Sequence, residues 1–359
     1  MASLDTGGPQ CIAPVLQALH GLIGFDAGCY IHTDAGTGGE GELHVHMENP
    51  AMQAAMPDYF DPRILKSELQ VLHRSSQQMA ETLRLEWGVR MLPQMVKVPL
   101  PELLRSDFYN VVLRPGGVGD CMSLVLRTPQ GEGIGTFKLY RQGWSRPFTP
   151  QDAAALERLH PSLARALQPG ELDAADTEIG AQGLLVATPA GRLQWASPGA
   201  DALMALAFGA RWRSRLSGSL PPAVQLLLQR LFWPQHPPDG GEAPPPLPQL
   251  ELRNANGWFS LRATHLAAAG GGVGEAAAIH ITQRVARGAR LQAALRALGL
   301  PRRQQELAYW LARGLAEPHI AERMGVSINT VAYHRRQLYA ALGVQNRQAL
   351  AARLTTPQG

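Results

Sequence analysis

Apolar and polar positions alternate or repeat in a way that divides the first 168 residues into strands and helices. "CMSLVLRT" and "GIGTFKLYR" have the pattern of strands, and the "PQGE" between them is typical of a hairpin connection. "FTPQDAAALERLHPSLARAL" has helical periodicity, with Thr149 as the expected N-cap and Pro150 in the first turn. A further helical stretch is expected over 61–83. We therefore predict that residues 1–168 form one unit of sheet and helices.

A polar segment over 168–182, which contains Pro and Gly, predicts a short linker to a second unit. Residues 183–204 have the pattern of a strand, a turn at Pro189–Gly191, a second strand and a helix. The Pro-rich residues 233–249 cannot hold regular structure, and "GGGVGE" at 270–275 is expected to be a loop between two strands. The second unit is predicted to span residues 178–283.

The last part of the chain is predicted to be entirely helical. A connecting helix is expected within 284–299, with Leu291, Leu295 and Leu298 along one face, and four short helices are expected within 300–355. We expect this leucine stripe to belong to a dimer interface together with the last helix near Leu350. The alternative is that the stripe packs on the second unit. The fold class that follows is α+β multidomain: two sheet-plus-helix domains, then an all-α domain.

The third of these four helices has two different faces. At about 100° per residue, Val331, Leu338 and Leu342 fall within roughly 40° of one another. The opposite face collects Asn329, Ala332, Tyr333, Arg336 and Ala340. Gly325 is expected to end the preceding helix in a left-handed conformation, and Ser327 to cap this one. Two helices joined by a tight turn with glycine, the second more cationic, are typical of a helix-turn-helix.

Charge is distributed unevenly along the 359 residues. Residues 284–354 hold twelve Arg, no Lys and three Glu, so this segment carries +9. Because the whole chain carries +4, the remainder carries −5. A basic module on an acidic body indicates a polyanion partner, and the helix pattern favours double-stranded DNA over a solvated arginine-rich tail.

Other features narrow the class of protein. Cys11, Cys29 and Cys121 have no metal-type spacing and are too few for a disulfide framework; Cys121 is expected to be packed. No apolar run predicts a membrane span or a signal peptide, so a cytoplasmic protein without a membrane partner is expected. His44 and His46 would face one side of a strand, but no third metal ligand is evident. No catalytic motif is present, and we expect no enzyme activity and no cofactor.

The C-terminal segment resembles the LuxR-type (GerE-like) helix-turn-helix of bacterial transcription regulators over about 55 residues. The residues that carry the resemblance are Glu306, Leu311, Ala312, Gly314, Ile320, Ala321, Val326, Ser327, Thr330, Val331, His334, Leu338, Leu342, Gly343 and Arg347. The segment departs from the pattern at Arg335, where an apolar residue is common. The resemblance implies that the third helix enters the major groove.

By this resemblance, Ala332, Tyr333 and Arg336 are the base-facing positions, and Asn329 shares their face. Arg can bind guanine with two hydrogen bonds, whereas Ala offers only apolar contact. The remaining candidates would position the DNA backbone: Thr330, His334, Arg323, Arg347 and, through its guanidinium, Arg335. Two alternatives stay open: His334 could serve a hydrogen bond within the domain, and Tyr333 could be a solvated surface ring.

The two preceding units resemble GAF-type and PAS-type domains, respectively. The GAF-like features are the hairpin strands, the helix that follows them and "RSDFYNVVLRPGG"; the PAS-like feature is "GLLVATPAGRLQWASPGADALM". Both families are sheet-plus-helix cups that bind small molecules or dimerise. The strands "CMSLVLRT", "GIGTFKLYR" and "GLLVAT" supply apolar walls, so a small, mostly apolar effector is expected. Alternatively, both cups are filled by their own side chains and serve as dimer scaffolds.

These features predict a one-component transcription regulator that binds a DNA operator as a homodimer, is controlled by a small-molecule effector and works with RNA polymerase. A sigma-factor-like initiation protein is an alternative, disfavoured because no long polar-aromatic helical region precedes the helix-turn-helix. A second alternative is a ligand-binding or catalytic protein with a vestigial DNA-binding tail. The intact basic face of the third helix argues against it.

Overall fold

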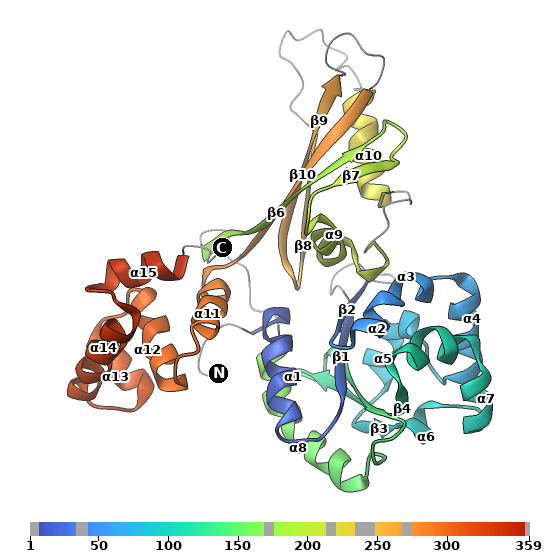
Figure 1. Cartoon of the computed structure of the whole chain (residues 1–359), viewed down its shortest axis with the longest axis horizontal. Helices are drawn as coiled ribbons and strands as arrows, with labels where there is room; N and C mark the ends of the chain where they lie inside the picture. Colours follow the sequence, from blue (N-terminus) through green and yellow to red (C-terminus); the bar gives the residue numbers. More distant parts are fainter. Residues whose placement is uncertain are drawn as a thin grey trace. The chain divides into compact units, whose positions relative to one another are not determined.

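The computed structural model describes residues 7–33, 42–168, 176–212, 220–233, 248–267 and 275–355. These residues fall into two compact units (Figure 1). The larger unit holds residues 7–168 and 181–283 apart from the gaps, and the smaller one holds residues 176–180 and 284–355. Most of the Pro-rich stretch 233–249 and the "GGGVGE" stretch 270–275 lies outside the described residues. The observed α+β architecture, two sheets with helices and a C-terminal helical domain, agrees with the predicted fold class.

The first sheet has five strands in the order β2-β1-β5-β4-β3. Its strands are β1 (Ala27–Thr33), β2 (Leu43–Met47), β3 (Val89–Met91), β4 (Val118–Arg127) and β5 (Gly133–Gln142). All four neighbouring pairs are antiparallel. The predicted hairpin is confirmed as β4 and β5, because Cys121 lies opposite Tyr140 and Leu124 opposite Phe137.

Helices cover both faces of this sheet, as Figure 1 shows. One face packs Leu124 and Phe137 against α1 (Ile12–His20) and α8 (Pro150–Leu167), which begins at the predicted Thr149 cap. The other face carries Cys121 and Tyr140. It packs against α2 (Pro50–Ala54), α3 (Met56–Tyr59), α4 (Pro62–Val71), α5 (Met79–Leu85), α6 (Leu92–Met95), α7 (Leu100–Arg105) and the π-helical turn η3 (Tyr109–Leu113). Short 3-10 turns lie at η1 (Pro9–Cys11), η2 (Ser76–Gln78) and η4 (Arg114–Gly116).

Two predicted segments in this region end differently from the expectation. The helix expected over 61–83 stops at Val71, because Leu72 turns to an extended conformation and pairs with Val96 as an isolated bridge. The chain re-enters helix only after the capping box at Ser75. The linker expected over 168–182 ends earlier than predicted, because β6 already begins at Thr177.

The second sheet repeats the strand order of the first: β7-β6-β10-β9-β8. Its strands are β6 (Thr177–Ala187), β7 (Leu193–Ala196), β8 (Gln249–Asn254), β9 (Gly257–Ala267) and β10 (Glu275–Ala286). The predicted strand, turn, strand and helix appear as β6, Gly191 at φ 78°, β7 and α9 (Ala200–Phe208). The core of this domain packs one face of the sheet against α9 and α10 (Pro222–Phe232), and a 3-10 turn, η6 (Ala210–Trp212), follows α9.

The C-terminal domain consists of helices alone, as predicted. They are α11 (Arg287–Ala297), α12 (Arg302–Ala312), α13 (Glu317–Met324), α14 (Ile328–Leu342) and α15 (Arg347–Thr355). One apolar core joins all five. No helix among the described residues combines the length and apolar character needed to cross a membrane.

The leucine stripe of α11 corrects one prediction. Leu291, Leu295 and Leu350 are each less than 5% exposed and lie in this core, and Leu298 packs partly buried against it. They are therefore buried in the helical core of the C-terminal domain and do not form a free dimer surface. The reason is that α12 and α15 offer apolar faces close by in the same chain, and short helices bury such faces only by packing together.

Candidate nucleic-acid interface

The caps of the short C-terminal helices determine where each helix begins and ends. Ser327 accepts a hydrogen bond from the Thr330 amide at 3.1 Å and starts α14, as predicted. Asn346 accepts one from the Ala349 amide at 2.8 Å and starts α15. Each bond satisfies a backbone donor that a helix start leaves unpaired.

The same motif ends three of these helices. Gly314, Gly325 and Gly343 all have positive φ, at 87°, 63° and 65°. After α13, the Val326 amide bonds the Ala321 carbonyl and the Gly325 amide bonds the Glu322 carbonyl, and the same pair of bonds follows α12 and α14. This is the Schellman motif, which needs a residue that tolerates the left-handed conformation. The turn between α13 and α14 therefore has a defined geometry.

The buried side of α14 is the predicted one. Val331 and Leu338 are at most 1% exposed, and Leu342 is 9% exposed, in the core shared with α12 and α13. The packing presents the opposite face to solvent. Asn329 and Arg336 are exposed there, and Tyr333 is 54% exposed.

The exposed side chains of this face are weakly held. Arg336 makes one long contact, from Nε to the Ala332 carbonyl at 3.4 Å, and no ion pair among the described residues. Gln337 donates to the Tyr333 hydroxyl at 2.8 Å, which orients the ring along the helix. Ala332 is half-buried on the same side. Arg336 is thus a guanidinium with most of its donors free to bind another molecule.

The other candidates have partners inside the domain. The Arg335 guanidinium pairs with Glu317 of α13, so its aliphatic stem crosses the helix-turn-helix toward a carboxylate. Arg347 donates to the Gly314 carbonyl at 3.0 Å and to the Leu315 carbonyl. The Arg323 guanidinium lies 4.4 Å from the centre of the Trp310 ring. Sequence reasoning did not find these partners, because each lies on another helix or loop.

Thr330 and His334 lie where α14 meets its neighbours. The Thr330 hydroxyl is 2.8 Å from that of Ser327. The buried Nδ1 of His334 has no hydrogen-bond partner among the described residues, and its ring meets Tyr333 edge-on at 5.5 Å. The alternative role for His334, a hydrogen bond within the domain, is therefore not found at this nitrogen.

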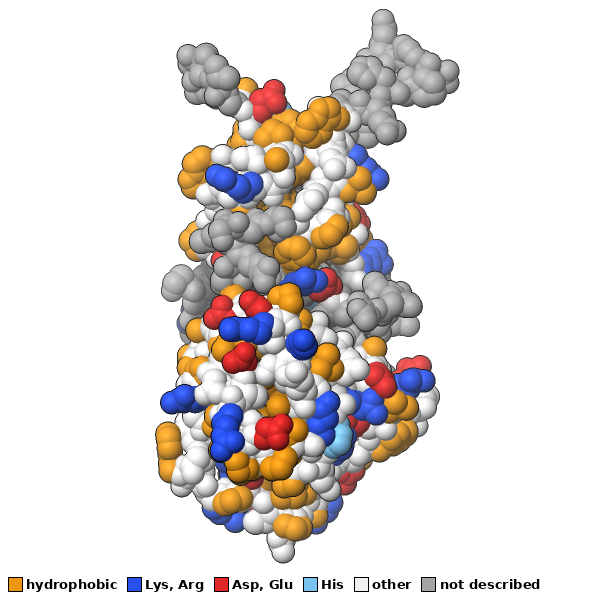
Figure 2. Space-filling view, turned by 90° about the vertical axis from the view of Figure 1, so that its right-hand side faces the viewer, with side chains coloured by type: hydrophobic (Ala, Val, Ile, Leu, Met, Phe, Trp, Pro, Cys, Tyr) orange, Lys and Arg blue, Asp and Glu red, His pale blue; other side chains and the backbone are white. Residues whose placement is uncertain are grey.

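Three arginines reach one hollow between α14 and the start of α15. Its lining residues are Leu311, Glu317, Arg335, Arg336, Tyr339, Gln345, Asn346 and Arg347. Cations that converge on a concave surface favour an anion there, and Glu317 offsets only part of this charge. In contrast, Figure 2 shows acidic and basic side chains intermixed on the face in view, with hydrophobic side chains between them.

Residues 299–354 match the family "bacterial regulatory proteins, luxR family". This match confirms the predicted resemblance for the C-terminal domain. The probable transcriptional regulatory protein SgaR of Hyphomicrobium methylovorum is 47% identical over 53 residues. That similarity covers 15% of this chain and 25% of the relative, so it spans about a quarter of the relative's length.

Solved structures give only distant likenesses. Escherichia coli SdiA is 12% identical, with 96% of this chain and 87% of that chain covered, at a TM-score of 0.27. VqmA bound to DPO is 16% identical, with 50% and 87% covered, at a TM-score of 0.19. At these scores nothing about this chain follows from them.

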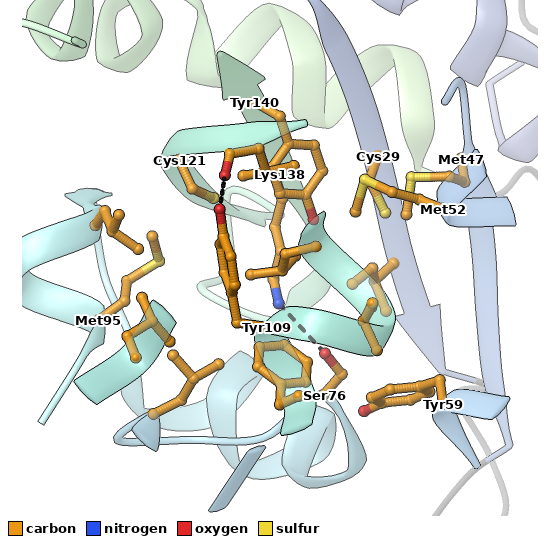
Figure 3. A pocket seen from close by; sticks show the side chains of 18 of the residues that line it. Cys29, Met47, Met52, Tyr59, Ser76, Met95, Tyr109, Cys121, Lys138 and Tyr140 are labelled. Carbon is orange, nitrogen blue, oxygen red and sulfur yellow. Dashed lines mark hydrogen bonds between the residues drawn. The ribbon is translucent and has the colours of Figure 1, made fainter. Parts of the chain in front are cut away.

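A second candidate site is a cavity in the first domain, between its sheet and the helices α2, α3, α6 and α7 with the turn η3 (Figure 3). It measures about 80 Å³ as the space open to the centres of water molecules. Leu, Met, Val, Ile and aromatic side chains make up most of its wall, and two of the predicted cup strands contribute Cys121, Lys138 and Tyr140. "GLLVAT" does not line it. Sequence reasoning found the two strands but not Lys138, whose only signal is a lone cation in an apolar run.

One of the two candidate metal ligands, His44, is held by neighbouring side chains. His44 is buried and stacks on His32 with ring centres 5.0 Å apart, and its Nδ1 is 3.1 Å from the Asn256 side-chain nitrogen. Among the residues described by the structure, no three His, Cys, Asp or Glu side chains gather as metal ligands would. Cys121 is buried as expected, and burial raises the pKa of its thiol to about 12.

Proposed function

We propose that this protein is a transcription regulator whose α14 binds the major groove of a specific DNA operator. The observation that carries the proposal is the solvent-facing row of Asn329, Tyr333 and Arg336, opposite a fully buried apolar seam, in a segment of charge +9. Such a row has the length and donor chemistry to reach base edges. The luxR-family match supports the same conclusion.

The candidate DNA-binding residues form two sets, one proposed to read bases and one proposed to contact phosphates. Arg336, Tyr333, Ala332 and Asn329 are the base-reading set, because they share one face of α14. Among the described residues, no ion pair occupies the guanidinium of Arg336. The phosphate-positioning set consists of Thr330, His334, Arg335, Arg323 and Arg347. Arg335 and Arg347 reach the same hollow as Arg336, so a phosphate seated there meets charges from both α14 and α15.

The remainder of the function concerns assembly and control. A single recognition helix contacts few base pairs, so we propose a homodimer on a two-fold operator. The two sheet domains are proposed as GAF-like and PAS-like, the first with an effector in its cavity. An effector regulates only if it binds one arrangement of the protein more tightly than the other. RNA polymerase is the proposed partner in transcription.

The test is binding of the full-length protein to operator duplexes selected from a random pool. Affinity should fall steeply with salt, by about 0.9 in log–log slope for each phosphate contacted. Arg336→Ala should weaken specific binding by about 1–3 kcal/mol and relax the preference at one base pair. The matched control is Arg353→Ala, which removes one exposed arginine from the last turn of α15 and should leave that base preference unchanged. If Arg336→Ala retains full affinity and base preference, the base-reading assignment is wrong.

A further inference from the structure

Lys138 is the one charged side chain among the described residues that line the cavity of the first domain. It extends from β5 across the cavity, and Figure 3 shows its nitrogen meeting Ser76 on the far side. The Nζ–Oγ distance is 3.3 Å, and this is its one hydrogen-bond partner among the described residues. An ammonium has three donors, so two remain for a molecule in the cavity.

A buried network holds the serine that meets Lys138. Glu68, which is fully buried, accepts hydrogen bonds from the Ser76 hydroxyl at 3.2 Å, the Ser76 amide at 3.1 Å and the Tyr59 hydroxyl at 2.8 Å. The hydroxyl proton of Ser76 is therefore already used, and its lone pair accepts from Lys138. Ser76 positions the ammonium but has no donor left for a ligand.

The rest of the cavity does not neutralise Lys138. Burial raises the pKa of Cys29 and of Cys121 to about 12, so both thiols are neutral. Burial raises the pKa of Glu68, whereas Lys138 and the hydrogen bonds from Tyr59 and Ser76 oppose this rise. Glu68 does not line the cavity, and the hydrogen bonds of the described residues connect it to Lys138 through Ser76. A cation with free donors in an apolar wall is best satisfied by an anionic acceptor.

The size of the cavity limits the rest of the ligand. Its 80 Å³ is about five to eight times the space that one water molecule requires. This volume suits a compact body of about six to ten non-hydrogen atoms, and the walls around it are aliphatic, thioether and aromatic.

We propose that the cavity binds a small monocarboxylate with an apolar body, and that the carboxylate contacts the ammonium of Lys138. The inference rests on the proposed function, in which this cavity receives the effector. The apolar body lies against residues such as Met52, Leu103 and Phe108. Lys138 is the ligand-binding residue, and Ser76 is a positioning residue.

The experiment is calorimetric titration of the full-length protein with benzoate, phenylacetate and hexanoate, each against its neutral amide. The carboxylates should bind about tenfold or more tightly than the amides, because only they bring a full negative charge to the ammonium of Lys138. Lys138→Met retains length and apolar bulk but no charge, and should abolish this preference. The control Lys66→Met removes an exposed lysine of α4 and should retain it.

Each outcome either supports or overturns the proposal. Equal binding of acids and amides by the unmodified protein overturns it without any variant, so a folding defect in Lys138→Met does not obscure the result. No binding of either series also overturns it. Operator binding distinguishes this result from the proposed function: a protein that binds DNA but no carboxylate loses only this inference. A carboxylate that binds without changing DNA affinity supports the inference and removes the effector from the proposed function.

Discussion

Replacement of Arg347 by Ala should loosen the connection between α12 and α13, whereas replacement of Arg336 by Ala should not. Both arginines line the same hollow, but Arg347 is half-buried and bonds two loop carbonyls, those of Gly314 and Leu315. Arg336 is exposed and makes one long contact within its own helix. Their side chains are chemically identical, so the difference in stability reports the difference in environment.

The expected magnitude follows from the two bonds. A hydrogen bond to a charged group contributes about 1.5–3 kcal/mol when shielded from water, and partial exposure of Arg347 reduces each bond to about 1 kcal/mol. Arg347→Ala should therefore cost about 2 kcal/mol of local stability. Arg336→Ala should change stability by less than about 0.5 kcal/mol, as is usual for an exposed side chain.

The assay is native-state hydrogen exchange of the full-length protein. The Gly314 and Leu315 amides are bonded to the Leu311 and Trp310 carbonyls at the end of α12, so they report opening of this loop. At about 1.4 kcal/mol per factor of ten, Arg347→Ala should speed their exchange roughly thirtyfold. Arg347→Lys, which can replace one of the two bonds, should fall between. If the exchange of these amides in Arg347→Ala matches that of Arg336→Ala, the structural role assigned to Arg347 is refuted.

Two further predictions concern buried groups. Leu295→Ala removes a side chain that is 2% exposed from the helical core and should cost about 2–5 kcal/mol, measured as faster exchange of the amides of α11; unchanged protection would place α11 outside this core. Burial and the neighbouring His44 lower the pKa of His32 to about 3, below the value near 6.5 of an unfolded histidine. The unfolded chain therefore binds protons first, and stability should fall below pH 6.5, by about 2 kcal/mol at pH 5. Exchange of β1 and β2 amides, corrected for intrinsic rates, should show this loss in the unmodified protein and less of it in His32→Gln; equal losses would contradict the assignment to His32.

The parts of the structure that the sequence predicted correctly depend on interactions between residues that are close together in the sequence. Ser327 and Gly325 mark the ends of helices because capping and the left-handed conformation are properties of a single residue and the next few amides. The buried and exposed sides of α14 follow from helical periodicity alone. The β4–β5 hairpin has the same local origin, since its strands are joined by five residues.

The surfaces that meet although they lie far apart in the sequence depend on the packing of the folded chain. Leu295 has the same apolar character in a dimer interface as in a core, and only the packing of α11 with α12 and α15 shows that it is buried within its own chain. Arg347 and Arg336 have identical side chains, yet one bonds a loop 32 residues away and the other faces solvent. Lys138 and Ser76 are 62 positions apart and meet only because the helices close over the sheet. Composition and periodicity determine which side chains can be buried, but their partners depend on the three-dimensional fold.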